Sequence, residues 1–213
     1  MITWWNGLSL VGSVAVTAPA GIAIALWLVA AERWRLALNW CLWYGGGMAL
    51  VVITKVAFIG WGLGISSIGF AGFSGHAMRA AAVFPVAFFV LRMNAGGRQK
   101  YFGVLLGAIL AVLISVSRVV VHAHTVSEAV SGCLLGLLVA GGFIWHARRV
   151  VELVVSHLLV FASMGGLLLM LSAEPVPTEQ WMTRLALFLS GRAQAFSRAD
   201  WEAAPHLAPH LTP

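Results

Sequence analysis

Long runs of apolar residues constrain this chain more than any other feature of its sequence. The runs extend roughly over residues 8–30, 36–58, 77–92, 102–121, 125–145 and 150–172. A helix needs about 20 apolar residues to cross the hydrocarbon core of a bilayer, so the third run is short for a full span. Because 61% of the residues are hydrophobic and only 9% are charged, we predict an integral membrane protein. Its fold class is then all-α, a bundle of about six transmembrane helices.

The C-terminal residues 174–213 follow a different pattern from residues 1–173. Two prolines, Pro175 and Pro177, interrupt the apolar pattern. After them, apolar residues recur at helical spacing among polar ones, namely Trp181, Leu185, Phe188, Leu189 and Phe196. This pattern predicts an amphipathic helix on the membrane surface, followed by a Pro/His-rich end. We therefore divide the chain into a transmembrane bundle, 1–173, and an interfacial tail, 174–213.

The basic residues between the apolar runs indicate the orientation of the bundle. They occur in alternate connections, as Arg33 and Arg35, then Arg92, Arg98 and Lys100, then Arg148 and Arg149. Short loops rich in Lys and Arg stay in the cytoplasm, so both termini and the connections 55–76 and 118–128 are predicted to lie outside. The formal net charge of +6 then reflects topology and contact with anionic lipid headgroups, and it does not indicate a nucleic-acid partner. We expect a bacterial-type cytoplasmic (inner) membrane protein with a site on its outer face.

One acidic residue stands out because it is the only one between Arg33 and Val151, namely Glu128. A carboxylate at the membrane edge is costly and usually faces a partner or a cavity. Glu128 follows His124 by four residues, so in a helix the two side chains share a face. A carboxylate so placed can fix the imidazole tautomer and stabilise its charged form, as a nucleophilic histidine requires. We interpret His122, on the same turn, as a bystander.

A second polar cluster, Ser74, Gly75 and His76, opens the third apolar run. The first N–H groups of a helix have no partner within the helix, so this cluster could bind an anion. Gly75 would let the backbone approach a ligand, and Ser74 could both cap the helix and donate a hydrogen bond. Taken alone, the cluster is also consistent with a capped helix in a glycine-rich loop that binds nothing.

Together these residues resemble the phosphatidic acid phosphatase type 2 superfamily. That family has three motifs: a Lys followed after six residues by Arg-Pro, a PSGH sequence, and an SR followed by five residues, His, three residues and Asp. The third motif is present as SRVVVHAHTVSE, with Glu128 in place of Asp. The second is present as FSGH, with Phe73 in place of Pro, and the first is reduced to Lys55 because Gly62 replaces the Arg.

The resemblance implies a chemistry for each matched residue. His124 would attack phosphorus to give a phosphohistidine, Glu128 would orient His124, and His76 would be the general acid. The phosphoryl oxygens would be held by Lys55, Ser74, Gly75 and Arg118. No metal or other cofactor is implied. The substrate would be a lipid phosphate or pyrophosphate of the polyprenyl pyrophosphate, phosphatidic acid or phosphatidylglycerol phosphate class, and membrane lipids would be the other partners.

Two questions stay open from the sequence. Arg79, three residues after His76, either replaces the missing motif arginine or only extends to the membrane interface. The alternatives to a phosphatase are a lipid phosphotransferase of the same family, a non-catalytic lipid-binding relative, and a b-type haem protein. The haem alternative would draw its ligands from a histidine set comprising His76, His122, His124 and His157.

Overall fold

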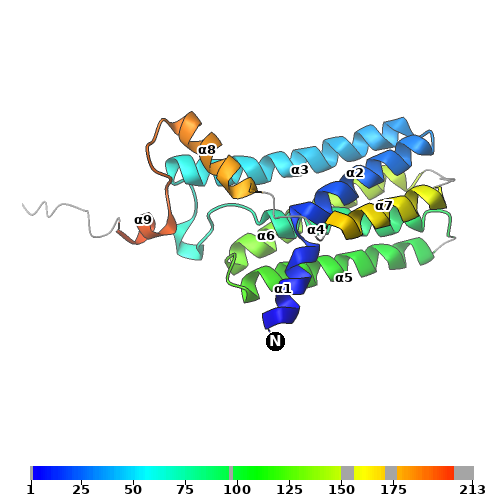
Figure 1. Cartoon of the computed structure of the whole chain (residues 1–213), viewed down its shortest axis with the longest axis horizontal. Coiled ribbons are helices and arrows are strands. Elements are labelled where there is room, and N and C mark those ends of the chain that lie inside the picture. The colour runs from blue at the N-terminus through cyan, green and yellow to red at the C-terminus, as the bar shows by residue number, and fades with distance from the viewer. Residues whose placement is uncertain (1, 96–97, 150–155, 171–176, 204–213) are drawn as a thin grey trace, which may run out of the picture.

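The structure is a computed structural model that describes residues 2–95, 98–149, 156–170 and 177–203. Its helices are α1 (Ile2–Val11), α2 (Val14–Ala30), α3 (Trp34–Trp61), α4 (Gly75–Leu91), α5 (Gln99–Val120), α6 (Val126–Ala147), α7 (His157–Met170), α8 (Thr178–Ser190) and α9 (Arg198–Ala203), with a short 3-10 turn η1 (Ser66–Ile68). The bundle helices run along the long axis of the molecule, and α8 and α9 lie at one end (Figure 1). The predicted all-α class is confirmed.

Four helical stretches in the described part of the chain are long and apolar enough to cross a membrane. They are Trp4–Ala30, Trp34–Trp61, Gln99–Val120 and Val126–Ala147. Helices α4 and α7 are apolar but shorter. Large apolar side chains such as Leu38, Ile109 and Leu138 point out of the bundle, where they can contact acyl chains. The chain is therefore a polytopic membrane helix bundle.

The first apolar run differs from the continuous helix that was predicted, because it is interrupted at Gly12 and Ser13. The backbone of Ser13 is extended, with φ −65° and ψ 161°. Gly12 lies so close to α5 that a Cβ atom there would come within 2.5 Å of Ile114 Cγ2. The chain therefore turns after α1, which packs across α5 at an angle to the bundle (Figure 1).

Helix α4 is the centre of the bundle. It packs mainly against α5 and α6, and its residues Ala77, Ala81 and Val83 are completely buried. Small residues let the neighbouring backbones approach closely: a Cβ atom on Gly107 would lie 2.5 Å from the Pro85 nitrogen, and one on Gly136 would lie 2.2 Å from the Met78 carbonyl oxygen. Because its neighbours enclose α4, it does not need the length of a lipid-facing span.

The predicted amphipathic tail helix is present as α8, which packs along the end of α3. Its small residue Ala186 is completely buried, and a Cβ atom on Gly60 of α3 would lie 3.2 Å from the Ala186 carbonyl oxygen. Phe188 on the other side of α8 is 83% exposed, so that side is available to lipid. The predicted boundary at residue 174 and the Pro/His-rich end, 204–213, lie outside the described residues.

Candidate active site

The matched motifs meet at one end of the bundle because the helices alternate in direction. Lys55 lies in the last two turns of α3, and Arg118 lies in the last turn of α5. Gly75 begins α4, and Glu128 lies in the first turn of α6. Helices α8 and α9 lie at this end too, and the connection from α2 to α3 is at the other end (Figure 1).

The turn between α5 and α6 fixes His124. The backbone N–H groups of Ala123 and His124 both donate to the Arg118 carbonyl oxygen, at 3.0 and 3.1 Å. His122, between them and α5, adopts a positive φ of 55° and is exposed. Helix α6 then begins with a capping box, in which Thr125 caps the Glu128 N–H and the Glu128 carboxylate accepts from the Thr125 N–H.

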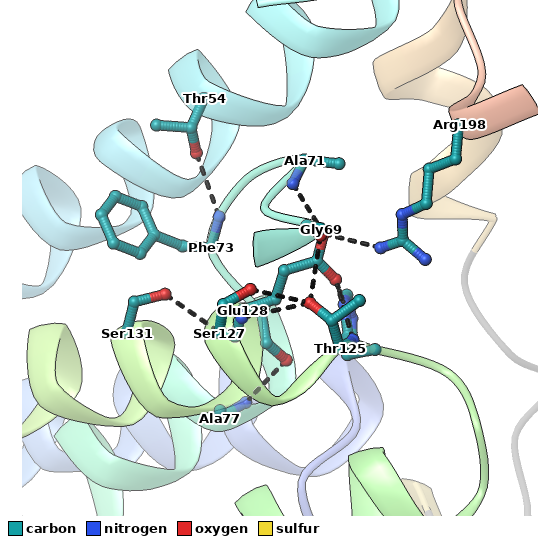
Figure 2. Close-up of polar contacts among 12 residues, drawn as sticks. Thr54, Gly69, Ala71, Phe73, Ala77, Thr125, Ser127, Glu128, Ser131 and Arg198 are labelled. Atoms are coloured by element: carbon teal, nitrogen blue, oxygen red, sulfur yellow. Dashed lines mark hydrogen bonds and ion pairs between the residues drawn. The ribbon is translucent and has the colours of Figure 1, made fainter. Parts of the chain in front are cut away.

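The carboxylate of Glu128 is 2% exposed and accepts four hydrogen bonds. Its Oε2 atom lies 2.8 Å from His124 Nδ1 and 3.3 Å from the Thr125 nitrogen. Its Oε1 atom lies 2.9 Å from the Ala71 nitrogen and 2.7 Å from Arg198 Nη2. Figure 2 shows Ala71 and Arg198 reaching this carboxylate from different parts of the chain. The contact with Nδ1 leaves the Nε2 atom of His124 available to a ligand.

The start of α4 is joined directly to the start of α6. Ser74 is completely buried, and its hydroxyl accepts from the Ala77 N–H at 3.5 Å as the N-cap of α4. The Ser74 N–H donates to the Glu128 carbonyl oxygen at 3.1 Å. Gly132 permits this approach, because a Cβ atom there would lie 2.6 Å from the Ser74 carbonyl oxygen. Ser74 therefore holds the two helices in register and borders neither of the cavities described next.

Two cavities meet at His124 and Lys55. The first, of about 300 Å³, is bordered by these two residues together with Glu128, Glu179 and Arg198. The second, of about 260 Å³, is bordered by Gly75, His76 and Arg79 as well as by Lys55 and His124. The structure thus brings Lys55, Gly75, His76, Arg79, His124 and Glu128 together around one space.

Arg79 does not extend to the membrane interface. It is 6% exposed, and its Nε atom donates to Thr17 Oγ1 of α2 at 3.0 Å. A Cβ atom on Gly75 would lie 2.9 Å from Arg79 Nη1, so the guanidinium group lies against the first residue of α4. This placement directs a positive charge into the second cavity.

Arg118 borders neither cavity, although it lies beside His124 in the α5–α6 turn. One guanidinium nitrogen, Nη1, donates to the hydroxyl of Ser9 in α1. The Nε atom is buried and has no hydrogen-bond partner within the described part of the chain. A buried donor without a partner is costly. The predicted contact of Arg118 with a phosphoryl oxygen stays a prediction.

Phe196 of the C-terminal segment fills the space beside Gly62, the position at which the first motif would have its arginine. Gly62 ends α3 with a positive φ of 70°, a backbone conformation that residues other than glycine rarely adopt. A Cβ atom there would lie 2.8 Å from the ring of Phe196. Glu179 of α8 and Arg198 of α9 border the first cavity. The sequence did not predict that these two residues border the cavity, because no local pattern connects them with the motifs.

Part of the chain matches a known protein family. The sequence profile of the PAP2 superfamily matches residues 57–151, a range that includes the second and third motifs and begins two residues after Lys55. The chain therefore belongs to the PAP2 superfamily.

Two curated relatives are similar to this chain. An "Uncharacterized 22.5 kDa protein in cps region" of Klebsiella pneumoniae is 32% identical over 207 residues, which cover 92% of this chain and 96% of the relative. Phosphatidylglycerophosphatase B of Bacillus subtilis (strain 168) is 37% identical over 67 residues, which cover 30% of this chain and 33% of that enzyme. No solved structure matches.

Proposed function

We propose that this protein is a membrane lipid phosphatase that hydrolyses a lipid phosphate or pyrophosphate through a phosphohistidine intermediate. The observation that carries the proposal is the lining of the second cavity. Lys55, His76 and Arg79 line one part of it, and the apolar residues Val51, Met182 and Leu185 line another. A cavity with both kinds of wall suits a phosphate headgroup attached to an apolar tail.

In the first step, the Nε2 atom of His124 attacks phosphorus. A bond forms between Nε2 and phosphorus, and the bond between phosphorus and the leaving oxygen breaks. Glu128 keeps the other proton of the imidazole on Nδ1, so the lone pair resides on Nε2, and it stabilises the positive charge that develops on the ring. His76 donates its proton to the leaving oxygen.

In the second step, water attacks the phosphohistidine. His76, now without its proton, accepts one from this water, and the bond between phosphorus and Nε2 breaks. Inorganic phosphate leaves in this step. The lipid product, an alcohol from a phosphomonoester or a lipid monophosphate from a pyrophosphate, has already left in the first step. Lys55 and Arg79, which border the second cavity, offset the negative charge on the phosphoryl oxygens in both steps, because charge-assisted hydrogen bonds are strongest in a site shielded from water.

The distribution of the basic residues supports a site on the outer face of a cytoplasmic membrane. Arg33 and Arg35 lie at the start of α3, and Lys55 lies near its end. Basic residues at one end of a membrane bundle favour the cytoplasm for that end, so the cavities face the periplasm or the exterior. The name of the Bacillus subtilis relative, phosphatidylglycerophosphatase B, supports phosphatidylglycerol phosphate as one member of the substrate panel.

Phosphate release from a panel of lipids tests the proposal. The purified protein in detergent is given undecaprenyl pyrophosphate, phosphatidic acid or phosphatidylglycerol phosphate. We expect release from at least one of them and a loss of at least about a thousandfold in His124→Ala, since the nucleophile is gone. His122→Asn is the matched control, because this exposed histidine is on the same turn and asparagine tolerates its positive φ.

Trapping with substrate labelled in the phosphoryl group adds a direct measurement. The wild type should carry an acid-labile label on His124, and His124→Ala should carry none. Equal labelling of the two proteins would contradict the assignment of the nucleophile. No phosphate release from any lipid in the panel would contradict the phosphatase function itself.

A further inference from the structure

Arg198 of the C-terminal segment contacts the Glu128 carboxylate of the candidate active site. Its Nη2 atom lies 2.7 Å from Oε1 of Glu128, the residue whose other oxygen contacts His124. Arg198 is 46% exposed on its side chain, whereas Glu128 is 2% exposed. A buried carboxylate is thus paired with a cation that comes from outside the bundle and that also borders the first cavity.

Several independent contacts hold the segment that carries Arg198. The backbone N–H of Phe196 donates to the Ile59 carbonyl oxygen of α3 at 2.8 Å. The rings of Phe196 and Trp201 both pack against Phe58, with centroids 5.6 and 4.9 Å apart. Trp201 Nε1 also donates to the Gly62 carbonyl oxygen at 3.4 Å. These contacts fix α9 against the end of α3, so Arg198 does not reach Glu128 by chance from a free chain end.

The first turn of α9 is stabilised by hydrogen bonds between Ser197 and Asp200. The backbone N–H and the hydroxyl of Ser197 both donate to Asp200 Oδ2, at 2.6 and 2.9 Å. These hydrogen bonds, the backbone one first, lower the pKa of Asp200. Both hydrogen bonds to this carboxylate join the residues on either side of Arg198.

We propose that Arg198 is a positioning residue of the active site, which holds the Glu128 carboxylate against His124 and supplies a positive charge that the first motif lacks at Gly62. This inference rests on the proposed function. Without Arg198, Oε1 would keep only the Ala71 N–H, and the carboxylate would be freer to turn away from the imidazole. The other charged or titratable groups around His124 are Lys55 of α3, His76 and Arg79 of α4, Arg118 of α5 and Glu179 of α8.

Three variants of the full-length protein test this role in turnover. Arg198→Ala should lower kcat by about tenfold with a smaller change in KM, and Arg198→Lys should recover most of the loss because it restores the charge. In Arg198→Ala the acid limb of the pH profile of kcat/KM should move upward by about one pH unit. The reason is that a cation near the imidazole is lost. Arg184→Ala is the matched control, since Arg184 is an exposed arginine of the same segment and borders neither cavity.

A second readout does not depend on turnover. Diethyl pyrocarbonate modifies the neutral imidazole, so the extent of His124 modification against pH, resolved by tandem mass spectrometry, gives a midpoint pH. We expect this midpoint to rise by about one unit in Arg198→Ala and to stay near the wild-type value in Arg198→Lys and Arg184→Ala. A lower midpoint in Arg198→Ala would contradict the expected sign and would refute the charge that we assign to Arg198 beside His124.

The two readouts separate the two proposals. If the wild type releases phosphate but Arg198→Ala keeps its kcat and its midpoint, the role of Arg198 is refuted and the phosphatase function stands. An Arg198→Ala protein that loses activity only in proportion to a loss of thermal stability, with an unchanged midpoint, refutes it as well. If no lipid is hydrolysed, the phosphatase function fails, and the midpoint alone decides whether Arg198 acts on His124.

Discussion

Replacing Glu128 with glutamine tests the central contact of the proposed mechanism. Glu128 Oε2 lies 2.8 Å from His124 Nδ1, and the side chain is 2% exposed. For charge centres about 4 Å apart and an effective dielectric constant of about 20, the attraction to a charged imidazole is about 4 kcal/mol. The amide oxygen of glutamine can still accept a neutral hydrogen bond worth about 1 kcal/mol. The remaining loss of about 3 kcal/mol lowers kcat by about a hundredfold.

The assay is the kcat of phosphate release in detergent, measured beside the thermal unfolding of each variant. Thr125→Ala is the structural control, because it breaks the same capping box and the contact with the Gly69 carbonyl oxygen but leaves the carboxylate. It should lower the free energy of unfolding by about 1 kcal/mol and kcat by less than about threefold. Glu32→Gln, an exposed residue of the α2–α3 connection, controls for the charge change. The reasoning is refuted if Glu128→Gln retains the kcat of the wild type, or if Thr125→Ala loses as much.

Two further substitutions test the phosphate-binding cation and the junction of helices α4 and α6. Arg79→Ala should lower turnover by about a hundredfold, as expected for the loss of one donor to the phosphoryl oxygens, whereas Arg92→Ala, exposed at the end of α4, should be almost silent. An unchanged kcat and KM in Arg79→Ala would show that this guanidinium is only structural. Gly132→Ala should lower both the melting temperature and kcat, because its Cβ atom would lie 2.6 Å from the Ser74 carbonyl oxygen. Gly141→Ala in the same helix, with nothing within 4 Å of the added atom, should keep both, and equal melting temperatures for the two glycine variants would contradict the packing argument.

Local spacing accounts for the part of the site that the sequence predicted. Residues four apart at the start of a helix share a face, and His124 and Glu128 do lie in contact. The placement of Ser74 at the start of α4 also follows from its preference for the N-cap. The hydroxyl of Ser74 accepts from the Ala77 N–H as the helix cap, and its predicted contact with a phosphoryl oxygen stays a prediction.

Tertiary contacts account for the part that the sequence did not predict. The apolar spacing of α8 indicates a membrane-facing side, and Phe188 does face outward. On the side of α8 that packs on α3, the buried residue is Ala186. Because alanine is small, it adds little to the apolar periodicity of the helix. A periodicity argument therefore places α8 on the membrane surface but gives no reason to place Glu179 or Arg198 at the cavities. Similarly, the break between α1 and α2 depends on the approach of Gly12 to Ile114, two residues far apart in the sequence.

The loss of the motif arginine and the docking of the tail depend on each other. Glycine at position 62 ends α3 in a left-handed conformation and leaves room for the ring of Phe196. The ring in turn brings its own backbone N–H to the Ile59 carbonyl oxygen, which α3 leaves free at its end. An arginine side chain at position 62 would compete with Phe196 for this space and would prevent α9 from carrying Arg198 to Glu128. Gly62 is thus required for Arg198 to supply the positive charge that we propose. Glycine at this position is therefore not in itself a sign that the site has lost its function.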